Sequence, residues 1–84
     1  MEEIQISLGR FATVDLVSVV VEGFNMTKSA ARRAIEQEGV RVWDDDGWET
    51  LPTFTTARCD VDGRILRCGK RNVKRIMLGD QHTA

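Results

Sequence analysis

The stretch MTKSAARRAIEQEGVRV, from Met26 to Val42, predicts one helix followed by one strand. Thr27 is a residue type that caps helix N-termini, and the interior after it holds three alanines and no β-branched run. Gly39 suits the left-handed residue that closes a helix, so we expect the helix to span about residues 28–38. The apolar pair Val40 and Val42 then begins a strand.

The preceding segment, FATVDLVSVVVEGF, predicts an earlier helix over about residues 14–22. Valine favours strands by propensity, but the polar residues Asp15, Ser18 and Glu22 recur at helical spacing and share one face. We expect Thr13 to cap this helix and Gly23 to end it.

Only a few residues connect the two helices, so we expect them to pack together as a helical hairpin or corner. Small side chains on the second helix allow a close approach. The expected packing face consists of Ala30, Ala31, Ala34 and Ile35.

The second half of the chain predicts strands joined by turns. The run DDDG at residues 44–47 is a solvated turn; Glu49 comes too early to complete a calcium loop, which needs about twelve residues. Pro52 disfavours a central strand at its position, and Asp62-Gly63 is a turn signal. The segment RILRCGKRNVKRIML predicts a hairpin that turns at residues 69–72.

The two ends of the chain carry weaker patterns. Residues 1–12 alternate weakly and fit a short strand or an ordered lead-in, and residues 79–84 are expected to form a flexible tail. Repeats and low-complexity linkers are absent from the sequence. We therefore expect a single α+β domain over residues 1–84, with two packed helices against a small, mostly antiparallel sheet.

Composition narrows the functional classes. The 84 residues have a formal net charge of -1, and no apolar run approaches the roughly 18 residues that span a bilayer. The start, MEEIQIS, has no signal-peptide pattern, and Cys59 and Cys68 are expected to be free thiols of a reducing, cytoplasmic compartment. With His82 they do not supply the four ligands of a zinc site. The sequence shows no catalytic motif, so we expect neither an enzyme nor a cofactor.

The positive charge is unevenly distributed. Ten of the twelve basic residues fall in two segments, one around the second helix and one from residue 64 to residue 75 that contains no acid. They are Lys28, Arg32, Arg33, Arg41, Arg64, Arg67, Lys70, Arg71, Lys74 and Arg75. Acids concentrate at the N-terminus and in the 44–49 loop, so a net charge near zero conceals a dipolar molecule.

The basic residues of the second helix predict a phosphate-binding ridge. Lys28 and Arg32 are i,i+4 neighbours, and Ser29 and Arg33 form a second line beside them. Guanidinium groups bind phosphate oxygens in pairs, and the free amides of a helix start accept phosphate as well. This pattern favours a nucleic-acid backbone as partner. An anionic membrane is disfavoured because exposed aromatic anchors are missing, whereas an acidic protein partner stays open.

The same residues resemble a known family. TKSAARRAIEQEGVRV is similar to the signature of the S-four-type RNA-binding domain, and Gly69, Lys70 and Arg71 match the closing hairpin of one branch of that family, the C-terminal domains of bacterial-type tyrosyl-tRNA synthetases. The resemblance covers about residues 13–78. It departs from the family at Glu38, where a second glycine is frequent, and at Trp43-Asp44, where Asn-Gly is frequent.

The resemblance implies a tRNA-binding domain that grips the anticodon stem and variable arm, with a synthetase catalytic domain attached elsewhere in the parent chain. It implies an RNA partner and neither DNA nor a membrane. The RNA-binding residues expected from ridge and hairpin are Thr27, Lys28, Ser29, Arg32, Arg33, Arg41, Lys70, Arg71, Lys74 and Arg75. Two alternatives stay open: a free-standing module of this fold on ribosomal or other structured RNA, and a protein-interaction domain with an acidic partner.

Overall fold

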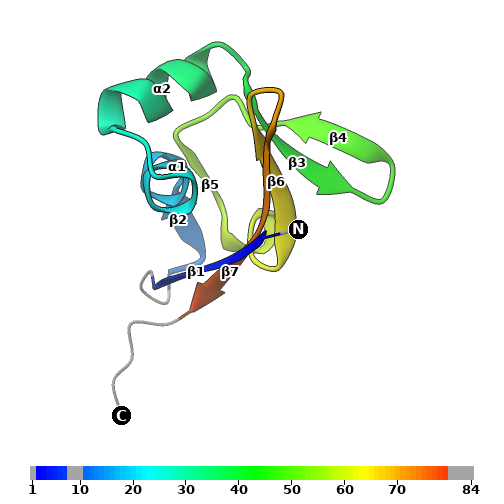
Figure 1. Cartoon of the computed structure of the whole chain (residues 1–84). Helices are drawn as coiled ribbons and strands as arrows, with labels where there is room; N and C mark the ends of the chain where they lie inside the picture. The colour runs from blue at the N-terminus through cyan, green and yellow to red at the C-terminus, as the bar shows by residue number, and fades with distance from the viewer. Residues whose placement is uncertain (1, 8–10, 80–84) are drawn as a thin grey trace.

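The computed structural model describes residues 2–7 and 11–79 of the chain, and this part forms a small α+β domain with two helices beside a mostly antiparallel sheet (Figure 1). The sheet has five strands, in the order β1 (Glu2–Ser7), β7 (Asn72–Gly79), β6 (Arg64–Cys68), β3 (Val40–Asp44) and β4 (Gly47–Thr50). Only the β1–β7 pair is parallel. The fold class expected from the sequence is thus confirmed at this level.

Helix α1 (Leu16–Phe24) begins two residues later than predicted, and the expected cap at Thr13 is wrong. The residues before it form β2 (Thr13–Asp15), which pairs with β5 (Thr55–Ala57) in a separate two-stranded sheet. The side chain of Asp15 caps the helix by accepting a hydrogen bond from the Val17 amide at 3.1 Å.

The expected helix end at Gly23 is also wrong, because Gly23 lies inside α1 and is buried. A Cβ at this position would come within 3.0 Å of Ile76 Cδ1, so glycine lets α1 lie close to β7. The helix ends instead at Asn25, whose left-handed φ of 55° is one that asparagine tolerates.

Helix α2 (Lys28–Glu36) starts where predicted, with Thr27 as its cap: Thr27 Oγ1 accepts a hydrogen bond from the Ala30 amide at 3.2 Å. The predicted left-handed closure at Gly39 is wrong, because Glu38 takes that conformation with φ 58°. The packing face is confirmed for the buried Ala31 and Ile35 and the half-buried Ala34, but Ala30 is exposed.

The strands of the second half follow the predicted turns and include one unexpected strand, β4. The β6–β7 hairpin turns at residues 69–71, and Gly63 before it has φ 73°, as turn glycines do. The acidic run is a turn, but β3 reaches Asp44 and pairs with β4, which was not expected. Pro52 follows β4 outside any strand. The predicted flexible tail falls on residues 80–84, outside the described residues, whereas Gly79 ends β7.

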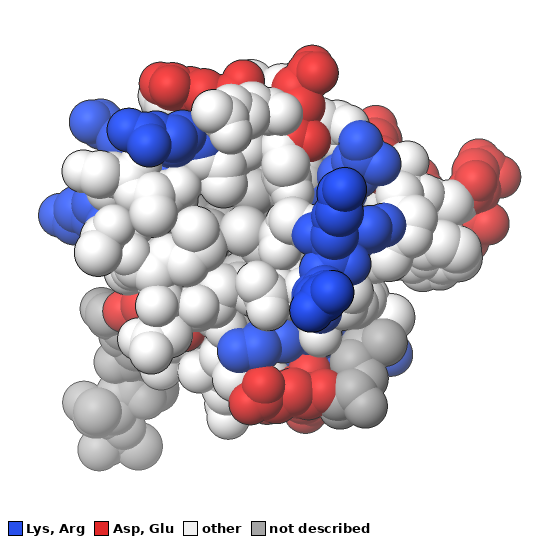
Figure 2. Space-filling view, turned by 45° about the horizontal axis from the view of Figure 1, so that its top comes forward, with Lys and Arg blue, Asp and Glu red and all other residues white. Residues whose placement is uncertain are grey.

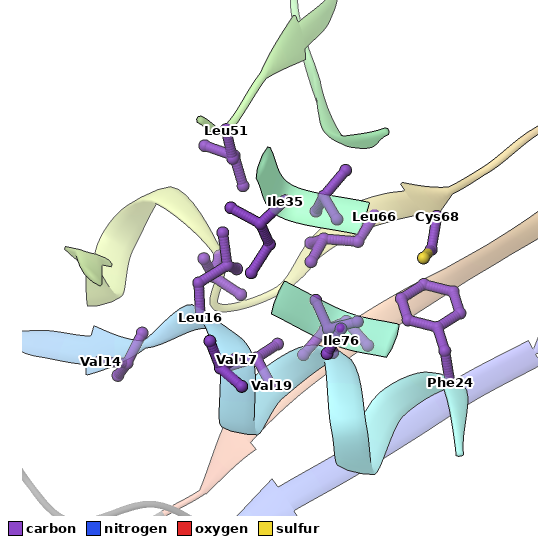
Figure 3. Close-up of a cluster of buried hydrophobic side chains, with 14 of the residues drawn as sticks. Val14, Leu16, Val17, Val19, Phe24, Ile35, Leu51, Leu66, Cys68 and Ile76 are labelled. Carbon is purple, nitrogen blue, oxygen red and sulfur yellow. The ribbon is translucent and has the colours of Figure 1, made fainter. Parts of the chain in front are cut away.

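The core lies between the two helices and one face of the sheet (Figure 3). Leu16 and Val19 of α1 and Ile35 of α2 meet Leu66 and Ile76 of the sheet, and all five side chains are fully buried. This core fixes α2 against the sheet. No helix within the described residues is long and apolar enough to cross a membrane.

Candidate nucleic-acid interface

The C-terminal end of helix α2 lies beside the β6–β7 turn (Figure 1). At one end of α2, Met26 Sδ accepts a hydrogen bond from Cys68 Sγ at 3.5 Å. At the other end, the Gly69 amide donates to the Gly39 carbonyl oxygen at 3.0 Å. Two segments separated by some thirty residues in the sequence are therefore held next to each other, and these are the two segments that carry most of the positive charge.

Five exposed basic side chains on these segments have no hydrogen-bond or ion-pair partner in the part of the chain that the structure describes. They come from α2, β3 and the β6–β7 turn: Lys28, Arg33, Arg41, Lys70 and Arg71. We call this set the open basic residues. Their donors are available to a ligand without breaking a contact of the fold.

Figure 2 shows how charge is arranged on the face that carries both segments. Lysine and arginine side chains gather over α2 and, separately, over the β6–β7 hairpin, with uncharged surface between the two groups. Acidic side chains lie at the edges of this face and at the tip of the β3–β4 hairpin. The positive charge thus forms two patches on one face rather than a continuous ridge.

The α2 patch includes a shallow hollow. Lys28, Ser29 and Arg32 line it together with Phe54 and with Asp15 and Ser18 at the start of α1. The Arg32 guanidinium carbon lies 5.6 Å from the centre of the Phe54 ring, which restrains this side chain by a cation–π contact. The hydroxyl oxygen of Thr27 accepts the capping hydrogen bond from the Ala30 amide, so the role of Thr27 in this patch is to position Lys28 and Ser29.

The hairpin patch continues onto the exposed face of the sheet. Arg41 of β3 is the direct cross-strand partner of Arg67 of β6. Arg67 donates from Nε to the Gly69 carbonyl oxygen at 2.9 Å and from Nη2 to that of Lys70 at 3.4 Å. These bonds hold the guanidinium of Arg67 against the turn.

Lys74 and Arg75, both predicted to bind RNA, instead make contacts within the fold. Lys74 faces the helices: its Nζ lies 3.0 Å from the Gly23 carbonyl oxygen, 3.3 Å from Glu2 Oε1 and 5.5 Å from the centre of the Phe24 ring. Arg75 points to the opposite face and donates to the Gly63 carbonyl oxygen at 3.1 Å. The structure therefore does not bring Lys74 together with the open basic residues.

Sequence reasoning left Arg67 and three exposed aromatic residues out of the candidate site. Phe54, Trp43 and Trp48 are 38%, 45% and 36% exposed. The sequence did contain a signal for the two tryptophans: they flank the DDDG turn, and a tight hairpin at that turn makes them cross-strand partners. No feature of the sequence indicated that Phe54, in the loop after β4, would contact Arg32 of α2.

Metal-ligand clusters and shifted pKa values do not add residues to the candidate interface. In residues 2–7 and 11–79 no group of three or more His, Cys, Asp and Glu side chains could hold a metal ion. Burial raises the pKa of the Cys68 thiol, whereas Cys59 is exposed; both thiols are free.

Comparison with known proteins adds no family assignment: the chain matches no protein-family model, and no curated protein matches it in sequence.

Proposed function

We propose that this domain binds structured RNA through the two basic patches on α2 and the β6–β7 hairpin. The observation that carries the proposal is the set of open basic residues, which lie on α2, β3 and the β6–β7 turn and are not paired to any described acid. Unpaired cations held close together repel one another, and a polyanion removes that repulsion while releasing its own counterions.

The spacing of the patches favours structured RNA over a small anion. Each patch offers several separate donors, from the α2 face and from the Gly69-Lys70-Arg71 turn, with uncharged surface between them. Two phosphate backbones, or two turns of one, match such an arrangement. Structured RNA is recognised mainly by shape and by phosphate and 2′-hydroxyl contacts, which exposed lysine and arginine side chains provide.

The finer proposal follows the sequence resemblance. We propose an S-four-type RNA-binding domain, of the kind that forms the C-terminal, tRNA-binding part of a tyrosyl-tRNA synthetase. Support comes from Thr27 as the cap of α2, from the Lys70-Arg71 turn beside this helix, and from the α+β arrangement. In this role the domain is not catalytic; it holds the anticodon stem and variable arm for an attached catalytic domain. Such a role implies a cytoplasmic protein, because tRNA is charged there.

A titration with tyrosine tRNA and an unrelated tRNA at two salt concentrations tests both RNA binding and the synthetase assignment. We expect binding that weakens with salt and prefers tyrosine tRNA. Equal binding of the two RNAs would overturn the synthetase assignment and favour a free-standing RNA-binding module. Absence of binding at low salt would overturn RNA binding and favour an acidic protein partner.

A further inference from the structure

The β3–β4 hairpin carries an exposed aromatic pair that the fold does not use to cover the core. Trp43 and Trp48 are cross-strand partners with ring centres 5.3 Å apart and ring planes 77° apart. They are the only two tryptophans of the chain. A perpendicular pair leaves both faces of one indole free of the other, and the hairpin projects away from the helices (Figure 1). An aromatic face is therefore presented to solvent.

A cross-strand aromatic pair can serve only to stabilise a hairpin. What distinguishes this pair is its arginine neighbours. The guanidinium carbon of Arg67 lies 5.7 Å from the centre of the Trp48 ring, and Arg41 is two residues before Trp43 on the same strand face. Arg67 uses Nε and Nη2 for the turn carbonyls, so its Nη1 donors stay available. Indole surface and cationic donors thus lie side by side.

The other side of Trp43 borders a hollow of mixed charge. Besides Trp43, its lining consists of Ile65 and Gly63, three aspartates (Asp44, Asp45 and Asp62) and two arginines (Arg64 and Arg75). Carboxylates repel a phosphate but accept hydrogen bonds from the amino groups of bases. The three aspartates of this hollow therefore favour the base of a nucleotide over its phosphate, and Arg41 and Arg67 offer donors for the phosphate on the same sheet face.

We propose that this exposed sheet face binds one unpaired nucleotide of the RNA, whose base stacks on Trp43 while Arg41 and Arg67 hold its phosphate. The inference rests on the proposed function and adds a requirement for an unpaired nucleotide beside the helical part of the RNA. A second copy of this chain is the less suitable occupant, because it would bring a second Arg41–Arg67 pair against the first.

The test uses the full chain and three versions of one RNA stem-loop: one with a single unpaired cytidine, one with an abasic nucleotide at that position, and one fully paired. Since both tryptophans belong to the site, intrinsic fluorescence reports stacking directly. We expect quenching by the unpaired cytidine alone, and affinity about tenfold higher than for the abasic RNA, at the lower end of base–aromatic stacking.

Protein variants separate stacking from electrostatic binding. Trp43→Leu keeps an apolar side chain in the hairpin but removes the π face; we expect it to lose the tenfold preference and keep its affinity for the paired RNA. Phe11→Ala, which removes another exposed aromatic ring, is the control and should behave like the wild type.

The outcomes are distinguishable. Equal affinity for unpaired and abasic RNA without quenching would overturn this inference and leave the proposed function standing. Failure to bind any of the three RNAs would overturn both. Fluorescence that changes with protein concentration in the absence of RNA would mean that a second copy occupies this face, which also overturns the inference.

Discussion

Arg41 of β3 lies directly opposite Arg67 of β6 on the exposed face of the sheet. Like charges in this position destabilise a sheet, and neither guanidinium has an acidic partner in the described part of the chain. An unfavourable pair of this kind is explained if an anion bridges the two groups. In our account that anion is a phosphate of the RNA.

The substitution Arg41→Thr separates the effect of Arg41 on stability from its effect on RNA binding. Removing one charge should raise the free energy of unfolding by about 0.5 kcal/mol, since the repulsion disappears and threonine suits a strand. RNA affinity should fall. Urea unfolding and RNA titration measure the two effects. Arg58→Gln is the matched control, because Arg58 belongs to neither basic segment and donates to the Gly79 carbonyl oxygen. A less stable variant with unchanged RNA affinity would make Arg41 a structural residue.

Lys70 and Lys74 form a matched pair of lysines with opposite expected roles. Lys70 is exposed in the turn, whereas Lys74 is bound to the end of α1 and to Glu2. Lys74→Met should lower the free energy of unfolding by about 2 kcal/mol, as expected for a lost hydrogen bond to a charged group, and leave RNA binding by the folded protein intact.

Lys70→Met should do the reverse: weaker RNA binding, with stability unchanged within about 0.5 kcal/mol. Chemical unfolding and RNA titration of both variants provide the comparison. Reduced RNA affinity in folded Lys74→Met would return Lys74 to the interface, as the sequence pattern predicted.

Glu38 holds a left-handed backbone conformation, φ 58°, directly after α2. Glycine adopts this conformation without the Cβ penalty, so Glu38→Gly should raise the free energy of unfolding by about 1 kcal/mol. Glu38→Gln keeps the Cβ and removes the charge; it should leave stability unchanged and strengthen RNA binding slightly. Thermal or urea unfolding of both variants measures the change in stability, and RNA titration of Glu38→Gln measures the change in affinity. A destabilised glycine variant would show that Glu38 makes a contact that outweighs the strain.

Cys68 links stability to alkaline pH. Its burial raises the pKa of the thiol above the ordinary value of 9.0, so the folded state holds this proton more tightly than the unfolded chain. The stability that the protonated Cys68 thiol contributes is fully present below the thiol pKa of the unfolded chain, and it is lost as the pH rises through the thiol pKa of the folded state. Stability should therefore fall above about pH 9, and less so in Cys68→Ala.

Thiol reactivity gives an independent check on Cys68. In the native protein Cys59 should be alkylated first, because it is exposed, and Cys68 only after unfolding. Mass spectrometry of partly labelled protein identifies the modified residue. Simultaneous labelling of both thiols under native conditions would mean that the end of β6 opens readily.

Local signals predicted α2 and the β6–β7 hairpin well, since a capping threonine and a glycine turn act within a few residues. They failed at the start of α1, where residues 13–15 pair with β5 and Asp15, the last of them, caps the helix. Short sequence windows do not show pairing across some forty residues. The parallel β1–β7 pairing was missed for the same reason.

The candidate site was predictable in composition but not in arrangement. Charge clustering identified the two basic segments, and the structure adds which side chains are open. It assigns Lys74 to the opposite face of the sheet from Arg67, because neighbouring strand residues alternate between faces. The position of Trp43 beside the arginines follows from the β3–β6 register, which no local pattern encodes.

The central claim is that the open basic residues bind RNA phosphates, and the salt dependence of RNA affinity tests it most directly. We would compare the wild type with a variant that carries Arg33→Gln, Lys70→Gln and Arg71→Gln, using Arg58→Gln, outside both basic segments, as the control. The account predicts that the slope of log affinity against log salt becomes shallower by about 2 to 3 in the triple variant, with little change in the control. An unchanged slope in the triple variant would contradict it.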